Sequence, residues 1–131
     1  MYTVLGIHPG DCQYLSLTLE EAISDIEDLI RDKSNTCVAL GEIGLDYHYP
    51  DTDKELQMEY FKAQMELAEK LSLPVVIHDR DAHGDVMDVI RSYPKVRGVL
   101  HSFSGSAEMA EELVRLGYMI SFSGTLTFKN A

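Results

Sequence analysis

The sequence predicts an α/β protein with a parallel sheet of about five strands flanked by helices. Five short apolar runs alternate with four amphipathic stretches, and no repeat or low-complexity tract interrupts this order. Most of the runs are apolar at every position, as is typical of strands in a parallel sheet covered by helices. The expected strands are residues 3–7, 36–43, 74–78, 97–103 and 118–122, within one domain, 1–131.

The first two expected helices have recognisable starts. One begins at Thr18, because Glu21 follows at the spacing of a capping box. Its apolar face is formed by Ala22, Ile23, Ile26, Leu29 and Ile30. The next begins near Thr52, with Glu55 three residues on, and Pro74 prevents it from continuing. Its long apolar side is expected to be ordinary core: Leu56, Tyr60, Phe61, Met65, Leu67, Ala68 and Leu71.

The last two expected helices are shorter. The third turns Val86, Val89 and Ile90 inward and ends before Pro94. The fourth starts at about Ser106 and ends at Gly117, a glycine suited to a left-handed cap. Its buried side is expected to be Met109, Ala110, Leu113 and Val114. Taken alone, the pattern favours an open doubly wound sheet, because five strands do not close a barrel of eight.

Composition limits the function classes. The formal net charge is −11 and the sequence pI is near 4.7, so the chain lacks long-range attraction for phosphates. A role in coating or scaffolding DNA is therefore not expected. An enzyme whose bound divalent cations supply local positive charge remains compatible with this composition.

Targeting signals and cysteines favour a cytoplasmic location. No apolar stretch reaches roughly 18 residues, so no membrane span is expected. The N-terminus has no basic region before its apolar run, unlike a signal peptide. Cys12 and Cys37 match no metal or redox spacing, which favours free thiols in a reducing compartment.

Four expected strands end in side chains that can bind a metal. His8, Glu42, His78 and His101 stand at or near these ends. Because the carboxyl ends of parallel strands meet at one rim, these side chains are expected to lie together. A glutamate and two histidines form a catalytic ligand set for zinc and also suit manganese or iron. The alternatives are structural histidines and a glutamate paired with a lysine or arginine.

Several strings together resemble the TatD family of deoxyribonucleases over essentially the whole chain. They are Gly6-Ile7-His8-Pro9, Gly41-Glu42-Ile43-Gly44-Leu45-Asp46-Tyr47, the segment 73–82, His101-Ser102-Phe103-Ser104-Gly105 and Ile120-Ser121-Phe122-Ser123-Gly124. The resemblance implies a partial TIM-like (β/α) barrel corresponding to strands three to seven of eight. It also implies a centre of two divalent ions (Mg, Mn or Zn) that cleaves DNA phosphodiester bonds, typically as a 3′ exonuclease.

The resemblance assigns roles by position. Glu42 matches the catalytic carboxylate that touches both metals, and His78 and His101 match the histidines of one metal. The family's His-x-His strand, its second strand and its aspartate-bearing C-terminal strand have no counterpart in these 131 residues. The chain by itself is therefore expected to bind one ion and to turn over weakly or not at all. The alternatives are a non-catalytic remnant that binds metal or a partner, and a related hydrolase of another ester, such as aminoacyl-tRNA.

Four further residues are candidates for substrate binding. Arg80 is expected to clamp a phosphate, the alternative being a salt bridge to Asp79, Asp81 or another acid. His8 is expected to face the cavity. Asp46 is expected to orient a ligand, or else to serve the loop alone. Ser104 precedes a helix start that could receive a phosphate, the alternative being a simple helix cap.

The two outer strands suggest self-association. Five strands of an eight-stranded barrel leave two sheet edges, near Val4 and Ile120. Their unpaired backbone groups can pair with another chain, so dimers or larger assemblies are expected.

Overall fold

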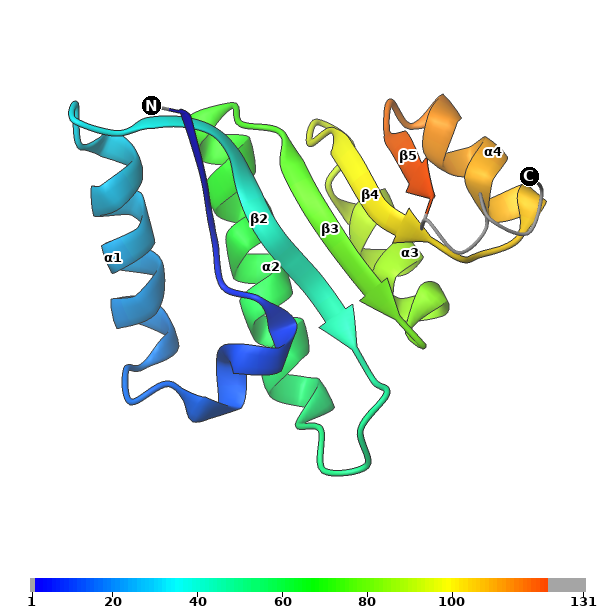
Figure 1. The fold of residues 1–131 in the computed structure, drawn as a ribbon, viewed down its shortest axis with the longest axis horizontal. Coiled ribbons are helices and arrows are strands. Elements are labelled where there is room, and N and C mark those ends of the chain that lie inside the picture. The colour runs from blue at the N-terminus through cyan, green and yellow to red at the C-terminus, as the bar shows by residue number, and fades with distance from the viewer. Residues whose placement is uncertain (1, 123–131) are drawn as a thin grey trace.

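The computed structural model describes residues 2–122 and contains one parallel sheet. Its strands are β1 (Tyr2–Leu5), β2 (Thr36–Asp46), β3 (Val75–Arg80), β4 (Gly98–Phe103) and β5 (Met119–Phe122). They lie in the order β1-β2-β3-β4-β5, every neighbouring pair is parallel, and β1 and β5 form the two edges (Figure 1). The predicted five-stranded parallel sheet is confirmed. Ser123 and Gly124 of the last motif lie outside the described residues.

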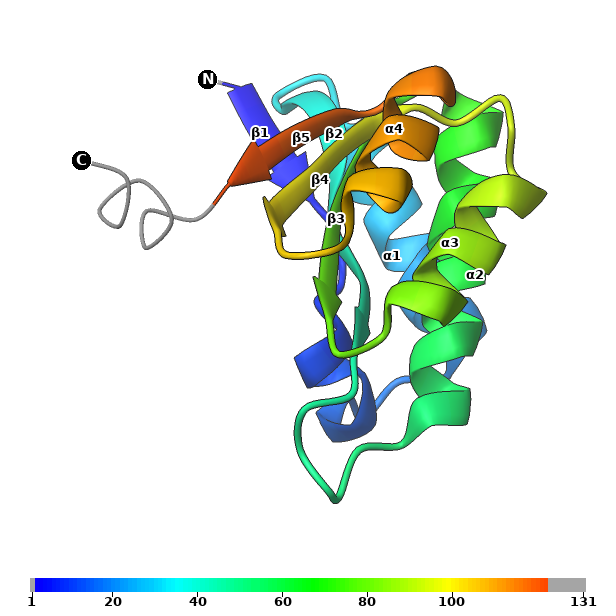
Figure 2. The same cartoon turned by 90° about the vertical axis from the view of Figure 1, so that its right-hand side faces the viewer.

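The helices cover a single face of this sheet. They are α1 (Leu19–Arg31), α2 (Lys54–Leu71), α3 (His83–Ser92) and α4 (Ala107–Arg115). Figure 2 shows all four on the same side, with the other face of the sheet left open. A doubly wound sheet has helices on both faces and reverses its strand order, so the open doubly wound arrangement favoured by the pattern alone is wrong. Sequential strands with helices outside match part of a (β/α) barrel.

The helix ends follow local side-chain chemistry. Thr18 caps α1, its hydroxyl accepting from the Glu21 amide and its amide donating to the Glu21 carboxylate, as the capping box predicted. Ser106 caps α4, and Gly117 follows this helix with φ of +92°. The start of α2 differs from the prediction, because Asp53, rather than Thr52, accepts the capping bond from the Leu56 amide.

A short 3-10 helix, η1 (Pro9–Tyr14), was not predicted. His8 is its N-cap and Pro9 its first residue, where a missing N–H costs nothing. It buries Pro9 and Cys12 and packs against α2 and β2. The helix therefore fixes the chain directly after His8.

The core lies between the sheet and its helices. The largest fully buried side chains include Leu40, Ile43, Leu45, Phe61, Met65, Ile77, Ile90, Leu100 and Leu113. Each contributes roughly 1.5–3 kcal/mol through removal of apolar surface from water. Tyr60, Phe61 and Met65 are buried, which confirms the core assignment of the α2 face. None of the described helices is long and apolar enough to cross a membrane.

Candidate metal centre

A strand irregularity places Glu42 on the open face of the sheet. Leu40 pairs with Val75 and Ile43 with Ile77, and the register shifts between Gly41 and Ile43. In a regular strand Leu40 and Glu42 would face the same side. The extra residue instead lets Leu40 and Ile43 both enter the core at 0% exposure, while the Glu42 side chain stays 28% exposed. A carboxylate is thus presented from the middle of an apolar strand without entering the core.

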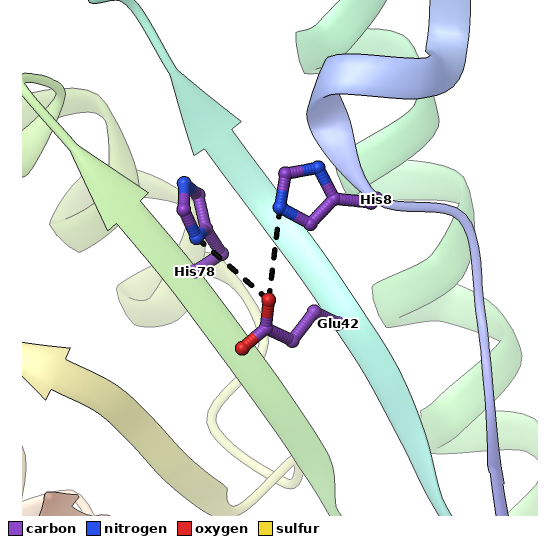
Figure 3. A group of neighbouring side chains, drawn as sticks. All are labelled: His8, Glu42 and His78. Atoms are coloured by element: carbon purple, nitrogen blue, oxygen red, sulfur yellow. Dashed lines mark ion pairs between the residues drawn. The ribbon is translucent and has the colours of Figure 1, made fainter.

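Three imidazoles surround this carboxylate. Glu42 Oε1 lies 3.6 Å from His8 Nε2 and 3.8 Å from His78 Nδ1, and Oε2 lies 2.6 Å from His101 Nδ1. Figure 3 shows His8, at the start of η1, and His78, on β3, both facing the same oxygen of Glu42. All of the ion-pair partners that residues 2–122 offer to Glu42 are histidines. The rim expected from the strand endings is therefore assembled, and the lysine or arginine partner considered for Glu42 is not what the described residues supply.

Asp46 determines which nitrogen of His78 is free. Burial by itself would raise the pKa of Asp46, but the hydrogen bond from the His48 amide, that from His78 and the charges of His78 and Arg80 together lower it. The ionised carboxylate accepts, so the His78 proton sits on Nε2, 3.0 Å from Asp46 Oδ2. In neutral His78, Nδ1 then carries a lone pair on the side of Glu42. Asp46 thus has the contact expected of a residue that orients a ligand.

His8 has the same tautomer as His78 but turns Nε2, not Nδ1, toward Glu42. Its Nδ1 accepts a hydrogen bond from the Gly10 amide at 2.9 Å, so the proton of the neutral ring sits on Nε2. Nε2 is the atom that faces Glu42. His8, Glu42 and His78 bring ligand atoms within 4.8 Å of one another, which by distance alone would suit a metal. The hydrogen bond from Gly10 argues against His8 as a ligand. It leaves the proton on Nε2, and a protonated nitrogen donates and does not ligate.

His101 approaches Glu42 from the other side. It comes from β4, its side chain is 53% exposed, and it contacts Oε2 while the other two histidines face Oε1. Oε1 of Glu42 therefore faces the imidazoles of His8 and His78, and Oε2 faces the imidazole of His101. Such an arrangement suits a carboxylate that reaches more than one positive centre.

Two buried glutamines on α2 hold the backbone at the site, and the sequence analysis did not identify them. Gln64 accepts from the Ile7 amide at 2.7 Å and donates to the Ile7 carbonyl at 3.3 Å. Gln57 accepts from the Asp46 amide at 2.8 Å and donates to the Asp46 carbonyl at 3.0 Å. β1 pairs with β2 only as far as Leu5. Beyond that point the two glutamine side chains bond backbone groups that a neighbouring strand would otherwise bond. Two glutamines seven residues apart on one helix face are the signal that could have revealed them.

Arg80 is available to a ligand. The two acids beside it are engaged elsewhere: Asp79 with His83 Nδ1 at 2.5 Å and Asp81 with His48 Nδ1 at 3.2 Å. The alternative of a salt bridge from Arg80 to either acid is thus not what these contacts show. His48 and His83 are thus the partners of these two carboxylates.

A cavity of about 560 Å³ lies next to the centre. Its lining includes His8, Asp46, His78 and Arg80. Of these, His8, Asp46 and Arg80 were expected to contact substrate. Ser104 is exposed in the β4–α4 loop and is not among the lining residues that the described chain provides. The helix cap at this position is Ser106, and a substrate role for Ser104 stays a prediction.

Comparison with known proteins agrees with this geometry. The family model described as "TatD related DNase" matches residues 1–131. The metal-dependent hydrolase YabD of Bacillus subtilis is 40% identical over all of this chain and half of its own length. The metal-dependent hydrolase YcfH of Escherichia coli K12 is 44% identical over 82% of this chain and 42% of its own.

Solved structures of TatD proteins have the same fold as this chain. YjjV, a TatD homologue from Escherichia coli K12, superposes with a TM-score of 0.87 at 34% identity, over 99% of this chain and 49% of its own. A TatD family hydrolase from Entamoeba histolytica gives 0.78 at 28% identity, over 94% and 42%. The chain thus spans about half the length of the relatives it matches. It belongs to the TatD-related DNase family.

Proposed function

We propose that this chain provides the metal centre of a metal-dependent hydrolase that cleaves phosphodiester bonds of DNA. The observation that carries the proposal is the Glu42 carboxylate enclosed by His8, His78 and His101. The metal-dependent hydrolases among its relatives and the family description support the chemical class and the substrate.

The donor atoms fit a divalent cation. Neutral His78 presents a lone pair at Nδ1, 3.8 Å from an oxygen of Glu42, and both atoms are acceptors. Two acceptors facing each other are stabilised by a cation between them, and imidazole with carboxylate suits Zn²⁺, Mn²⁺ or Mg²⁺ to different degrees. We therefore assign Glu42, His78 and His101 as the residues that hold the ion.

The remaining residues have roles toward the substrate. A bound divalent ion supplies an activated water and polarises a phosphoryl oxygen. His8 Nε2–H and the Arg80 guanidinium then donate to phosphate oxygens at the mouth of the cavity. Asp46 keeps His78 in the tautomer that can ligate, and Gln57 and Gln64 hold the backbone that carries Asp46 and His8.

The 131 residues by themselves are proposed to hold one ion and to turn over weakly or not at all. Hydrolysis with two metals needs one ion for the attacking hydroxide and one for the leaving oxygen. The relatives are about twice as long as this chain, and the resemblance places the ligands of a second ion outside the segments found here.

Calorimetry and a nuclease assay test the proposal. Mn²⁺ or Zn²⁺ is titrated into the chain, its Glu42→Gln variant and a control, Glu111→Gln, in an exposed position of α4. We expect one site in the original chain and the control and its loss in Glu42→Gln. Release of nucleotides from a 3′-labelled single-stranded oligonucleotide is measured in parallel. Metal binding that survives Glu42→Gln unchanged would contradict the assignment, and two tight sites would contradict the single ion.

A further inference from the structure

Arg80 stands at the point where β3 leaves the sheet and turns toward α3. Its carbonyl accepts a hydrogen bond from the Tyr47 amide at 2.9 Å, which ties its backbone to β2. The next residue, Asp81, has φ of +57°, in the left-handed region that residues other than glycine seldom adopt. Such a conformation persists only where neighbouring contacts hold it. The contacts of this turn therefore influence how Arg80 is presented.

Asp79 holds the turn from the side of α3. Its side chain is 3% exposed, accepts from the Ala82 amide at 3.2 Å and pairs with His83 Nδ1 at 2.5 Å. Ala82 is the N-cap of α3 and His83 its first residue. These buried bonds fix the end of β3 to the start of α3 and leave the side chain of Asp81 to be held from elsewhere.

His48 holds the turn from the other side, from the loop between β2 and α2. Its Nδ1 lies 3.2 Å from Asp81 Oδ2, and its ring meets the Tyr49 ring edge-on, with 5.0 Å between the centroids. The guanidinium carbon of Arg80 lies 5.7 Å from the Tyr49 ring centroid, within the range of a cation–π contact. Figure 1 shows this loop and the end of β3 at the same end of the sheet. His48 thus contacts both the residue that follows Arg80 and the ring that the guanidinium faces.

The contact between His48 and Asp81 lies outside the cavity. Arg80 and Tyr49 line the cavity of about 560 Å³, whereas neither His48 nor Asp81 is among the lining residues that residues 2–122 provide. The pair is also exposed, with side-chain exposures of 45% and 64%. An exposed ion pair contributes little to the free energy of unfolding. The position of this pair therefore suits a role in orienting Arg80 better than a role in stability.

We infer that His48 and Asp81 are positioning residues, whose contact holds the Arg80 guanidinium in the orientation that meets a phosphate in the cavity. The inference rests on the proposed function, in which Arg80 binds a phosphate, and adds two residues that act only through Arg80. Guanidinium is a planar fork that makes paired hydrogen bonds to phosphate oxygens. Its orientation therefore affects affinity, in addition to its charge.

A double-mutant cycle tests the inference. A single-stranded oligonucleotide with fluorescein at its 5′ end is titrated with the full chain in Mg²⁺, and anisotropy gives the Kd. Arg80→Ala should weaken binding about 10- to 150-fold, the effect of losing hydrogen bonds to a charged group. His48→Ala should weaken it about 2- to 10-fold, a coupling expected between residues in contact. In the Arg80→Ala background, His48→Ala should have no further effect, because the group through which it acts is gone.

Three controls separate positioning from structure. His48→Asn keeps a nitrogen donor near the place of Nδ1 and should recover most of the affinity. Asp88→Ala removes another exposed ion pair, that with Arg91 at 3.2 Å on α3, and should bind as the original chain does. His48→Ala should also keep the affinity for Mn²⁺ and the free energy of unfolding in urea, since its backbone amide still donates to Asp46.

The outcomes separate this inference from the proposed function. A His48→Ala variant that binds as tightly as the original chain, or that weakens binding equally with and without Arg80, would overturn the inference alone. Arg80→Ala with unchanged affinity, or an original chain that binds Mn²⁺ but no oligonucleotide, would remove the phosphate role of Arg80 and the inference with it. The metal titration of Glu42→Gln judges the centre independently, because the ion-pair partners that residues 2–122 offer to Glu42 include neither His48 nor Arg80.

Discussion

Asp46 accepts a hydrogen bond from Nε2 of His78 over 3.0 Å. The two residues come from neighbouring strands, β2 and β3, and their contact leaves Nδ1 of the same ring on the side of Glu42. One imidazole therefore stands between two carboxylates: it donates to Asp46 and turns the lone pair of Nδ1 toward Glu42. Under the proposed function, this polarity leaves Nδ1 of His78 able to ligate a metal.

Replacing Asp46 should weaken metal binding. In Asp46→Asn the side chain keeps its shape, but an amide both donates and accepts and no longer fixes the His78 tautomer. We expect about 10- to 100-fold weaker binding of Mn²⁺ or Zn²⁺ by calorimetry, the usual effect of losing such a partner. Asp25→Asn, exposed on α1 and not part of the cavity lining, is the control and should bind as the original chain does. Unchanged affinity in Asp46→Asn would refute the orienting role.

The same carboxylate should contribute to stability in a pH-dependent way. The folded-state pKa of Asp46 is lowered, although burial alone would raise it, because hydrogen bonds from His48 and His78 prevail. A lowered pKa gives stability that is present above the unfolded value, about 3.9, and is lost as the pH falls through the folded value. The free energy of unfolding in urea should therefore favour the original chain over Asp46→Asn at pH 6. That difference should shrink below about pH 4, and a difference independent of pH would argue against the assignment.

Gln64 should matter more than any exposed residue of the same helix. Gln64→Leu leaves the Ile7 amide and carbonyl without their partner, and an orphaned buried group costs about 1–3 kcal/mol. Lys62→Leu, exposed on α2, should change the free energy of unfolding by less than about 0.5 kcal/mol. Urea denaturation of the three proteins measures both effects. Equal stability of Gln64→Leu and Lys62→Leu would show that the hydrogen bonds between Gln64 and Ile7 do not stabilise the protein.

The two thiols should react at very different rates. Desolvation by burial raises the pKa of Cys12 to about 12, and its side chain is 3% exposed. Cys37 is only partly buried. Since the thiolate is the nucleophile, a maleimide at pH 8 should modify Cys37 first and reach Cys12 only on unfolding. Cys37→Ser should abolish the fast phase seen by mass spectrometry. A fast phase that remains in this variant would mean that Cys12 is accessible.

The sheet edges should promote self-association. Tyr2 and Val4 on β1 and Met119 on β5 are exposed apolar residues on the two outer strands of the sheet that residues 2–122 form. We expect dimers or larger species in sedimentation experiments at micromolar concentration. Val4→Lys and Met119→Lys should shift them toward monomer, since lysine on an edge opposes pairing. Val114→Lys, equally exposed but on α4, should not. A monomeric original chain would contradict the expectation.

Short-range patterns predicted much of the fold. The caps at Thr18 and Ser106 and the turn at Gly117 depend on residues three or four positions apart, so the sequence alone locates them. The start of α2 was placed one residue early, because Thr52 and Asp53 both have capping side chains and only the folded loop selects Asp53. The end of β2 was placed at residue 43, three residues short of Asp46, because Gly44 and Asp46 do not continue the apolar run on which the prediction depends.

The sequence by itself determined the candidate donor residues, their place at the strand ends and the parallel direction of the strands, since periodicity and motif spacing are local properties. The tertiary structure alone decided how each group is used. His8 and His78 share the Nε2–H tautomer, because Gly10 donates to Nδ1 of His8 and Asp46 accepts from Nε2 of His78, yet they turn different nitrogens toward Glu42. Gln64 reaches Ile7 across 57 residues of chain. Contacts of this kind depend on packing between elements that are distant in sequence. A local pattern of side chains does not show which distant element will supply the partner of a given polar atom.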